Sequence, residues 1–156
     1  MELWELVARE ACRDTLAQYT HAGDRYLLEE YAASFCEDGV LEIKGTPPVS
    51  GRAAIVQRVA DATGPSRRRP QGGDGGAQVP RKRIVRHNVT NVRFESLSPT
   101  EATVASYFTV FTEVGLDHMG RYRDQAVPVG DEGRWLIAHR LVSTDWRAPN
   151  STFLPR

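Results

Sequence analysis

The chain has 156 residues, enough to enclose one hydrophobic core and too few for two ordinary domains, so we expect one domain spanning residues 1–156. Lys and Arg number 20, as do Asp and Glu, and the formal net charge is zero. This balance gives no general argument for nucleic acid or an anionic membrane as a partner. We therefore expect neither nucleic acid nor a membrane as a partner.

The N-terminus lacks a basic segment followed by an apolar run, and no apolar stretch approaches the ~18 residues of a membrane span. The two cysteines, Cys12 and Cys36, show no spacing typical of a metal site. The sequence thus predicts a soluble cytoplasmic protein with buried, reduced thiols, no bound metal and no cofactor.

The first third of the chain is predicted to be helical. Apolar residues at helical spacing predict an amphipathic helix over residues 3–20, interrupted at 21–24 by a glycine and an aspartate. A second helix is expected from about Arg25 to Phe35, a turn at 37–39, a short strand over 40–43, and a third helix from Gly51 to about Asp61.

Residues 64–82 are rich in Gly, Arg and Pro and cannot bury a core. We expect a flexible, solvated loop near the mouth of a pocket. A clamp for an anion or nucleic acid is the alternative reading of the two arginine clusters. The zero net charge and the lack of interleaved aromatic residues favour the loop.

After residue 83 the apolar pattern alternates with a period of two. It predicts four long strands, over 84–94, 102–112, 116–129 and 134–146. Helices followed by an antiparallel meander indicate an α+β fold, in which a strongly curved antiparallel sheet wraps around three helices as a cone. The open end would form a small-molecule pocket. The other face of the sheet would need a cover, so we expect a homodimer or a higher homo-oligomer.

Asp24 and His87 are the candidate catalytic pair. A carboxylate bonded to one imidazole nitrogen fixes the tautomer and stabilises the imidazolium that forms when the other nitrogen takes a proton. Each residue also has a structural alternative. Asp24 could cap a helix starting at Arg25, and His87 could be a satisfied histidine within the sheet.

Strand alternation places Asn91 on the same face as His87, where both would meet a common ligand. Arg140 falls on an apolar row with Leu136, Ala138 and Val142, which should face inward. A buried arginine requires a partner, so Arg140 either pairs with a carboxylate such as Asp24 or binds a developing anion.

Other hydrogen-bonding side chains of these elements are candidates for contacting a substrate. His118 alternates in phase with Tyr122 and Asp124 and is a possible second acid/base group, whereas His21 and His139 are expected to be peripheral. Tyrosine hydroxyls suit the oxygen of an enolate or phenol. The candidate substrate-binding residues are Tyr19, Asn91, Tyr107, His118 and Tyr122.

Several of these motifs together resemble the SnoaL-like branch of the nuclear transport factor 2-like superfamily, over roughly residues 5–147. The resemblance rests on the first helix and on the segments 22–24, 35–39, 51–55 and 133–140. His87, Thr90 and Asn91 reproduce the His-x-x-Thr-Asn pattern of the hexachlorocyclohexane dehydrochlorinase, and Trp135 to Arg140 repeats its tryptophan-to-arginine spacing. Scytalone dehydratase and bile-acid dehydratases are similar in using an aspartate, a histidine and tyrosines.

The resemblance implies a cofactor-independent lyase or isomerase of the dehydratase or cyclase type. His87, oriented by Asp24, would remove a proton, while Arg140 or a tyrosine would stabilise negative charge. The substrate would be small and largely apolar, aromatic or polycyclic, as in natural-product or steroid-like metabolism.

Three alternatives remain open at this stage. Some members of the superfamily are non-catalytic ligand-binding or assembly modules, some are epoxide hydrolases or epoxide-opening cyclases that use an Asp–Arg–Asp set, and some are small subunits of ring-hydroxylating dioxygenases.

Overall fold

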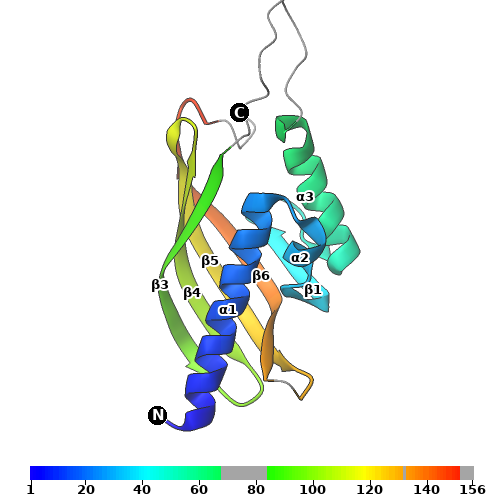
Figure 1. The fold of residues 1–156 in the computed structure, drawn as a ribbon, viewed down its shortest axis with the longest axis vertical. Helices are drawn as coiled ribbons and strands as arrows, with labels where there is room; N and C mark the ends of the chain where they lie inside the picture. The colour runs from blue at the N-terminus through cyan, green and yellow to red at the C-terminus, as the bar shows by residue number, and fades with distance from the viewer. Residues whose placement is uncertain (68–83, 132, 152–156) are drawn as a thin grey trace, which may run out of the picture.

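The structure is a computed structural model that describes residues 1–67, 84–131 and 133–151. Three helices lie in the first part of the chain and a long meander follows them (Figure 1). The elements are α1 (Leu3–Arg25), α2 (Leu28–Ala32), β1 (Phe35–Ile43), β2 (Val49–Ser50), α3 (Arg52–Arg67), β3 (Val85–Leu97), β4 (Ala102–Thr112), β5 (Gly115–Val129) and β6 (Arg134–Arg147).

The six strands form one open sheet in the order β2-β1-β6-β5-β4-β3, with α1 lying across one face (Figure 1). The α+β class is confirmed, but the sheet is mixed rather than wholly antiparallel, because β1 pairs in parallel with β6. The reason is the chain path. After β1 and β2, α3 leads to the far edge of the sheet at β3, and the meander returns to place β6 beside β1.

α1 is longer than predicted. The expected break at 21–24 is absent, because the helix continues to Arg25 and ends at Tyr26, whose backbone is left-handed with φ 59° and donates to Ala22 and Gly23 carbonyls. A single glycine costs a helix only about 1 kcal/mol, so Gly23 does not end it. Asp24 therefore lies in the last turn of α1, and the prediction that it caps a following helix is wrong.

The segment from α2 to α3 also differs from its prediction. α2 is shorter than expected, and β1 begins at Phe35 and includes the predicted turn at 37–39. A side chain at Gly39 would lie 2.9 Å from the carbonyl oxygen of Ile137, so glycine is needed for β1 to approach β6. α3 continues to Arg67, which makes the start of the predicted loop helical; the rest of that loop, 68–82, lies outside the described residues.

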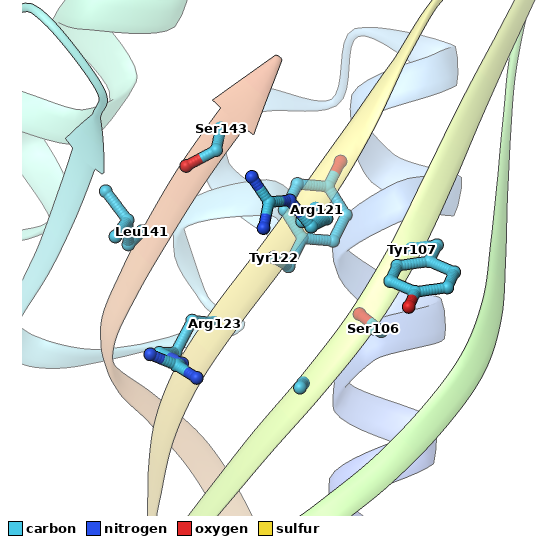
Figure 2. Close-up of a pocket in the computed structure, with 8 residues that line it drawn as sticks. Ser106, Tyr107, Arg121, Tyr122, Arg123, Leu141 and Ser143 are labelled. Atoms are coloured by element: carbon cyan, nitrogen blue, oxygen red, sulfur yellow. The ribbon is translucent and has the colours of Figure 1, made fainter. Parts of the chain in front are cut away.

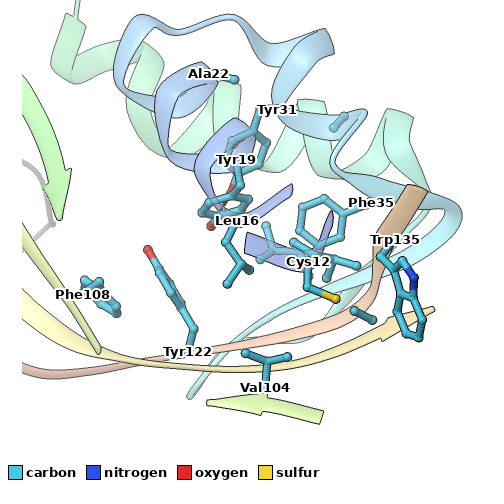
Figure 3. Close-up of a cluster of buried hydrophobic side chains, with 14 of the residues drawn as sticks. Cys12, Leu16, Tyr19, Ala22, Tyr31, Phe35, Val104, Phe108, Tyr122 and Trp135 are labelled. Atoms are coloured by element: carbon cyan, nitrogen blue, oxygen red, sulfur yellow. Dashed lines mark hydrogen bonds between the residues drawn. The ribbon is translucent and has the colours of Figure 1, made fainter. Parts of the chain in front are cut away.

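The four long strands agree with their predictions to within three residues at each end. Their inner face packs on one stripe of α1, because residues four apart on a helix share a face. Ala8, Cys12, Leu16 and Tyr19 form this stripe, and all are buried. Figure 3 shows the stripe against the sheet residues. The sheet side of this core includes Val104, Phe108, Tyr122, Trp135 and Ile137.

Both cysteines are free, Cys12 buried and Cys36 half-buried. Burial, assisted by Asp124, raises the pKa of the Cys12 thiol to about 12, so this side chain is a packing group and not a nucleophile. Within the described ranges, no helix has the length and apolar character needed to cross a bilayer.

Candidate functional site

Asp24 and His87 meet where the last turn of α1 reaches the start of β3. The Asp24 Oδ1 lies 2.6 Å from Nδ1 of His87, and the backbone N–H of His87 donates to the two carboxylate oxygens at 3.2 and 3.1 Å. One carboxylate thus holds both the ring and the main chain of the histidine. The side chains are 10% and 15% exposed, respectively, so the pair is neither sealed in the core nor fully solvated.

This contact follows from the topology. β3 is an edge strand, so its main chain bonds β4 on one side and leaves the other side to be satisfied by another element. α1 packs against β3, and the carboxylate at its end accepts the His87 N–H. Because Nδ1 of His87 is bonded to a carboxylate, Nε2 is the ring nitrogen that is able to take up a proton. The arrangement is that of a general base with a fixed tautomer.

A second histidine–carboxylate pair lies beside the first. Nδ1 of His118 on β5 is 2.8 Å from Oδ1 of Asp117, and both side chains are buried. The rings of His118 and His87 have centroids 6.5 Å apart and stand nearly perpendicular. Burial lowers the pKa of His118, Asp117 opposes that shift and His87 adds to it. A charge on His87 therefore disfavours protonation of His118.

Arg140 on β6 is fully buried and held on three sides. Its Nε and Nη2 donate to the two oxygens of Asp124 at 2.7 and 2.8 Å. The guanidinium carbon lies 3.9 Å from the ring centre of Tyr19 and 4.2 Å from that of Tyr122. Burial alone would lower the pKa of Arg140, but Asp124 outweighs it and the pKa is raised, so the group is a permanent cation. Among the described residues, Nη1 has no hydrogen-bond partner.

Three tyrosines occupy the space between α1 and the sheet (Figure 3). The Tyr31 hydroxyl donates to the Tyr19 hydroxyl at 2.6 Å, and the Tyr19 ring lies edge-on to Tyr122 at 5.8 Å. Burial raises the pKa of both Tyr31 and Tyr122 well above the ordinary value. These hydroxyls therefore stay protonated and are hydrogen-bond donors.

A family model described as SnoaL-like domain matches residues 4–141. The chain belongs to this family. It is a branch of the nuclear transport factor 2-like superfamily, as the sequence motifs predicted. No curated protein matches the sequence.

Solved structures share the fold of this SnoaL-like domain. A Novosphingobium aromaticivorans protein provisionally assigned as a scytalone dehydratase is 24% identical, with a TM-score of 0.74 and coverage of 95% of this chain and 91% of its own. A Catenulispora acidiphila protein solved in complex with S-DNPA is 28% identical, with a TM-score of 0.67 and coverage of 85% and 90%. ActVI-ORFA of Streptomyces coelicolor is 23% identical, with a TM-score of 0.69 and coverage of 88% and 96%.

Six of the eight predicted site residues therefore gather between α1 and the inner face of the SnoaL-like sheet, together with two unpredicted carboxylates. Asp24 joins His87 as expected, and His118 has the phase of Tyr122. Arg140 does meet a carboxylate, but the partner is Asp124 and not Asp24. The inward residues of the prediction are Asp24, His87, Arg140, His118, Tyr19 and Tyr122.

Arg140 also faces inward in a different phase from the one predicted. Gln125 pairs with His139 but Ala126 pairs with Ile137, so Ala138 is an extra residue that interrupts the alternation of β6. This bulge brings Arg140 into phase with the core residue Ile137 instead of with Ala138.

Asn91 and Tyr107 are not part of the site. Asn91 has a positive φ of 53° and lies where the pairing of β3 with β4 shifts register, so it is exposed and Val92 takes the inward phase. The prediction that Asn91 shares a face with His87 fails because a bulge resets the alternation. Tyr107 lies on the outer face of β4 and is 52% exposed.

The outer face carries a shallow cavity of about 170 Å³ (Figure 2). It lies on the opposite side of the sheet from α1 and away from the two histidines. Its lining includes Tyr107, Arg121, Arg123, Leu141 and Ser143. This is not the pocket that the cone-shaped fold led us to expect on the inner side.

Asp117 and Asp124 are the site residues that sequence reasoning missed. The strand alternation could have identified Asp124, because this residue alternates in phase with His118. Its strand also lies next to the strand of Arg140. No sequence pattern could have identified Asp117, since a residue next to His118 in a regular strand should face the opposite side of the sheet. His21 is exposed and His139 pairs with Glu42 at 2.9 Å, away from the two dyads, as predicted. In the part of the chain that the structure describes, no cluster of His, Cys, Asp and Glu could hold a metal ion.

Proposed function

We propose that this SnoaL-like domain is a cofactor-independent lyase or isomerase, of the dehydratase or cyclase type, that acts by general acid–base catalysis. The observation that carries the proposal is the Asp24–His87 pair, in which one carboxylate binds both Nδ1 and the main-chain N–H of the histidine. That pair is a preset base with a defined reactive nitrogen, and the partial exposure of its side chains makes it accessible to a substrate.

In the proposed reaction Nε2 of His87 removes a proton from a carbon next to a carbonyl. The electron pair of the broken C–H bond forms a double bond, and the hydroxyl on the next carbon takes the proton from the His87 imidazolium and leaves as water, which returns His87 to its neutral form. Asp24 stabilises the imidazolium formed in between. A positioned base contributes roughly 10²–10⁴-fold, so orientation and electrostatics must supply the rest.

His118 and the tyrosines supply further proton donors and acceptors. The position of His118 next to His87 suits it to hydrogen-bond the reacting oxygen. The hydroxyls of Tyr19 and Tyr122 suit the carbonyl oxygen, on which negative charge develops. Arg140 acts through them, because its guanidinium is held between the two rings and is paired with Asp124. In this account Arg140 is a positioning residue.

The substrate class follows from the aromatic surroundings of the dyads. Phe108 stacks on Tyr122 at 4.5 Å and lies edge-on to His118 at 6.0 Å, so a ligand near the histidines meets aromatic faces. Flat aromatic or polycyclic molecules with a carbonyl and a hydroxyl fit such surroundings. The likeness to a protein assigned as a scytalone dehydratase and to one bound to S-DNPA supports the same class.

Turnover of a panel of aromatic β-hydroxyketones tests the proposal. Loss of water extends conjugation and is followed by ultraviolet absorbance. We expect His87→Ala to lower kcat/KM by roughly 10²–10⁴-fold. His139→Ala is the matched control, because His139 also pairs with a carboxylate but lies far from the dyads. Equal activity of His87→Ala and the wild type on a turned-over substrate would reject the proposal.

A second candidate is a non-catalytic ligand-binding module. It is favoured by the packing of aromatic rings between α1 and the sheet, where Tyr19, Tyr31 and Phe35 contact one another with centroids 4.3–6.2 Å apart. Calorimetric binding of panel members without any turnover, unchanged in His87→Ala, would favour this module over the enzyme.

A further inference from the structure

Asp117 and His118 are consecutive in β5, yet both side chains point inward. Successive residues of a regular strand face opposite sides of the sheet. Here Val110 pairs with His118 while Phe111 pairs with Leu116, so Asp117 is an extra residue on β5. This bulge turns the Asp117 carboxylate, which is fully buried, toward the same side as the histidine.

Among the described residues, the side chains of His118, Ser151 and Thr112 donate hydrogen bonds to the Asp117 carboxylate. Oδ1 accepts from Nδ1 of His118 at 2.8 Å and from the Ser151 hydroxyl at 2.7 Å, and Oδ2 accepts from the Thr112 hydroxyl at 3.2 Å. The main chain is tied as well, because the N–H of Ala148 donates to the Asp117 carbonyl at 2.7 Å. The chain that follows β6 thus folds back onto the bulge of β5.

Three donors around a buried carboxylate stabilise its ionised form, which is an acceptor only. The hydrogen bond to His118 must then be donated by Nδ1–H, and Nε2 becomes the acceptor of that ring. Without Ser151 and Thr112, the carboxylate loses two of the donors that stabilise its ionised form and fix its orientation, so the preference of His118 for Nδ1–H weakens.

We propose that Ser151 and Thr112 are positioning residues that hold Asp117 so that His118 keeps its proton on Nδ1 and presents Nε2 as an acceptor beside His87. The inference deepens the proposed function and rests on it for its catalytic meaning. The geometry of the hydrogen bonds carries it independently of turnover.

The charges around His118 agree with a neutral ring in this role. Burial is the main cause that lowers its pKa, and Asp117, on the same strand, opposes this. His87 on β3 lowers the pKa further, Asp24 on α1 is bonded to His87, and Arg147 on β6 is the cross-strand partner of His118. The ring is therefore neutral near pH 7, the state in which a fixed tautomer matters.

The test is ¹⁵N NMR of the histidine rings, in which long-range ¹H–¹⁵N correlations identify the protonated nitrogen. The wild type is expected to show His118 protonated on Nδ1 alone between about pH 6.5 and 8. Ser151→Ala and Thr112→Val are each expected to shift the tautomer ratio by about tenfold toward Nε2–H, the size of a lost bond to a charged group. Ser151→Thr keeps the hydroxyl and should restore the wild-type ratio.

Ser98→Ala, which removes a hydroxyl from an exposed turn, is the matched control and should change nothing. Backbone amide spectra of each variant establish that it is folded. A wild-type His118 protonated on Nε2, or a ratio unchanged in both Ser151→Ala and Thr112→Val, would overturn the inference.

Kinetics separate this inference from the proposed function. On a turned-over substrate, Ser151→Ala should lower kcat by about tenfold and leave KM unchanged, because Ser151 does not touch the substrate in this account. If no substrate is turned over but the tautomer depends on Ser151, the proposed function fails and the positioning role stands. Normal kcat with an altered tautomer would overturn the catalytic part of the inference.

Discussion

At the scale of residues, the site consists of pairs in which a carboxylate holds a histidine or an arginine in place. Asp24 fixes His87, Asp117 fixes His118 and Asp124 fixes Arg140. Buried ions are costly to isolate, so each pair is more informative about the site than its members are alone.

Arg140 and Asp124 give the first prediction. Arg140→Met leaves the Asp124 carboxylate buried without its two donors, and we expect it to lower the free energy of unfolding by about 3–5 kcal/mol. The double variant Arg140→Met/Asp124→Leu should recover much of that loss, because no charge is then isolated. Urea denaturation measures both values. A double variant less stable than Arg140→Met would contradict the claim that the isolated Asp124 charge causes the loss.

His118 gives a prediction on pH. Its pKa is lowered by burial in the folded state, below its ordinary value of 6.5, so below about pH 6.5 the unfolded chain binds a proton that the folded chain does not. Stability contributed by the neutral ring is complete above that pH and is lost as the pH falls toward the folded pKa. Urea midpoints measured from about pH 7 to 5 should therefore fall, and less steeply in His118→Gln. Equal slopes would contradict this prediction.

At the scale of elements, sequence patterns located the long strands well and missed the irregularities within them. The period-two alternation of β4, and of β5 from His118 onward, survives in the structure because one face of the sheet packs on α1. Bulges at Asn91, Asp117 and Ala138 depend on how two strands pair, which one strand's pattern does not contain. As a result, Asn91 faces away from the site and Asp117 faces toward it.

The end of α1 was missed for a different reason. Gly23 predicts the end of a helix. In the structure, its missing side chain leaves room for the Tyr31 ring, which lies 3.4 Å from the position that a Cβ of residue 23 would occupy. The identity of the Asp24–His87 pair was nevertheless predictable, since the family resemblance named both residues. The Asp124–Arg140 pair needed the strand register.

Gly120 in β5 and Gly23 in α1 give a paired prediction on stability. A Cβ on Gly120 of β5 would lie 2.0 Å from the Ser143 carbonyl oxygen and 2.8 Å from the Phe108 ring, so Gly120→Ala must displace β6. We expect it to cost at least ~2 kcal/mol or to prevent folding. Gly23→Ala meets only the side chain of Tyr31 and should be within ~1 kcal/mol of the wild type, because alanine favours the helix. Thermal unfolding of both proteins measures this difference, and equal stabilities would contradict the role of Gly120.

At the scale of the whole molecule, the sheet has an inner face packed on α1 and an outer face that carries exposed apolar side chains. Tyr107, Phe111, Met119 and Trp146 are 38–52% exposed, and Met119 pairs with Trp146 across the strands. The same face carries charges of both signs, for example in the ion pair between Arg121 and Asp145. A second copy related by a two-fold axis would meet this face with matching apolar area and opposite charges.

We therefore expect a homodimer through the outer face. Light scattering coupled to size exclusion should give twice the chain mass for the wild type and the monomer mass for Trp146→Arg. Leu6→Arg on α1, also at an exposed position, is the control and should remain dimeric. A monomeric wild type would contradict the expectation.

The central claim is that Asp24 and His87 together remove a proton from carbon, and isotope exchange tests that step without the rest of the reaction. The wild type, Asp24→Asn and His87→Ala are incubated in D₂O with an aromatic ketone, and deuterium at the carbon next to the carbonyl is followed by NMR. We predict exchange by the wild type and a loss of roughly 10²-fold or more in each variant, because either change removes the oriented base. Exchange at the wild-type rate in both variants would contradict the claim.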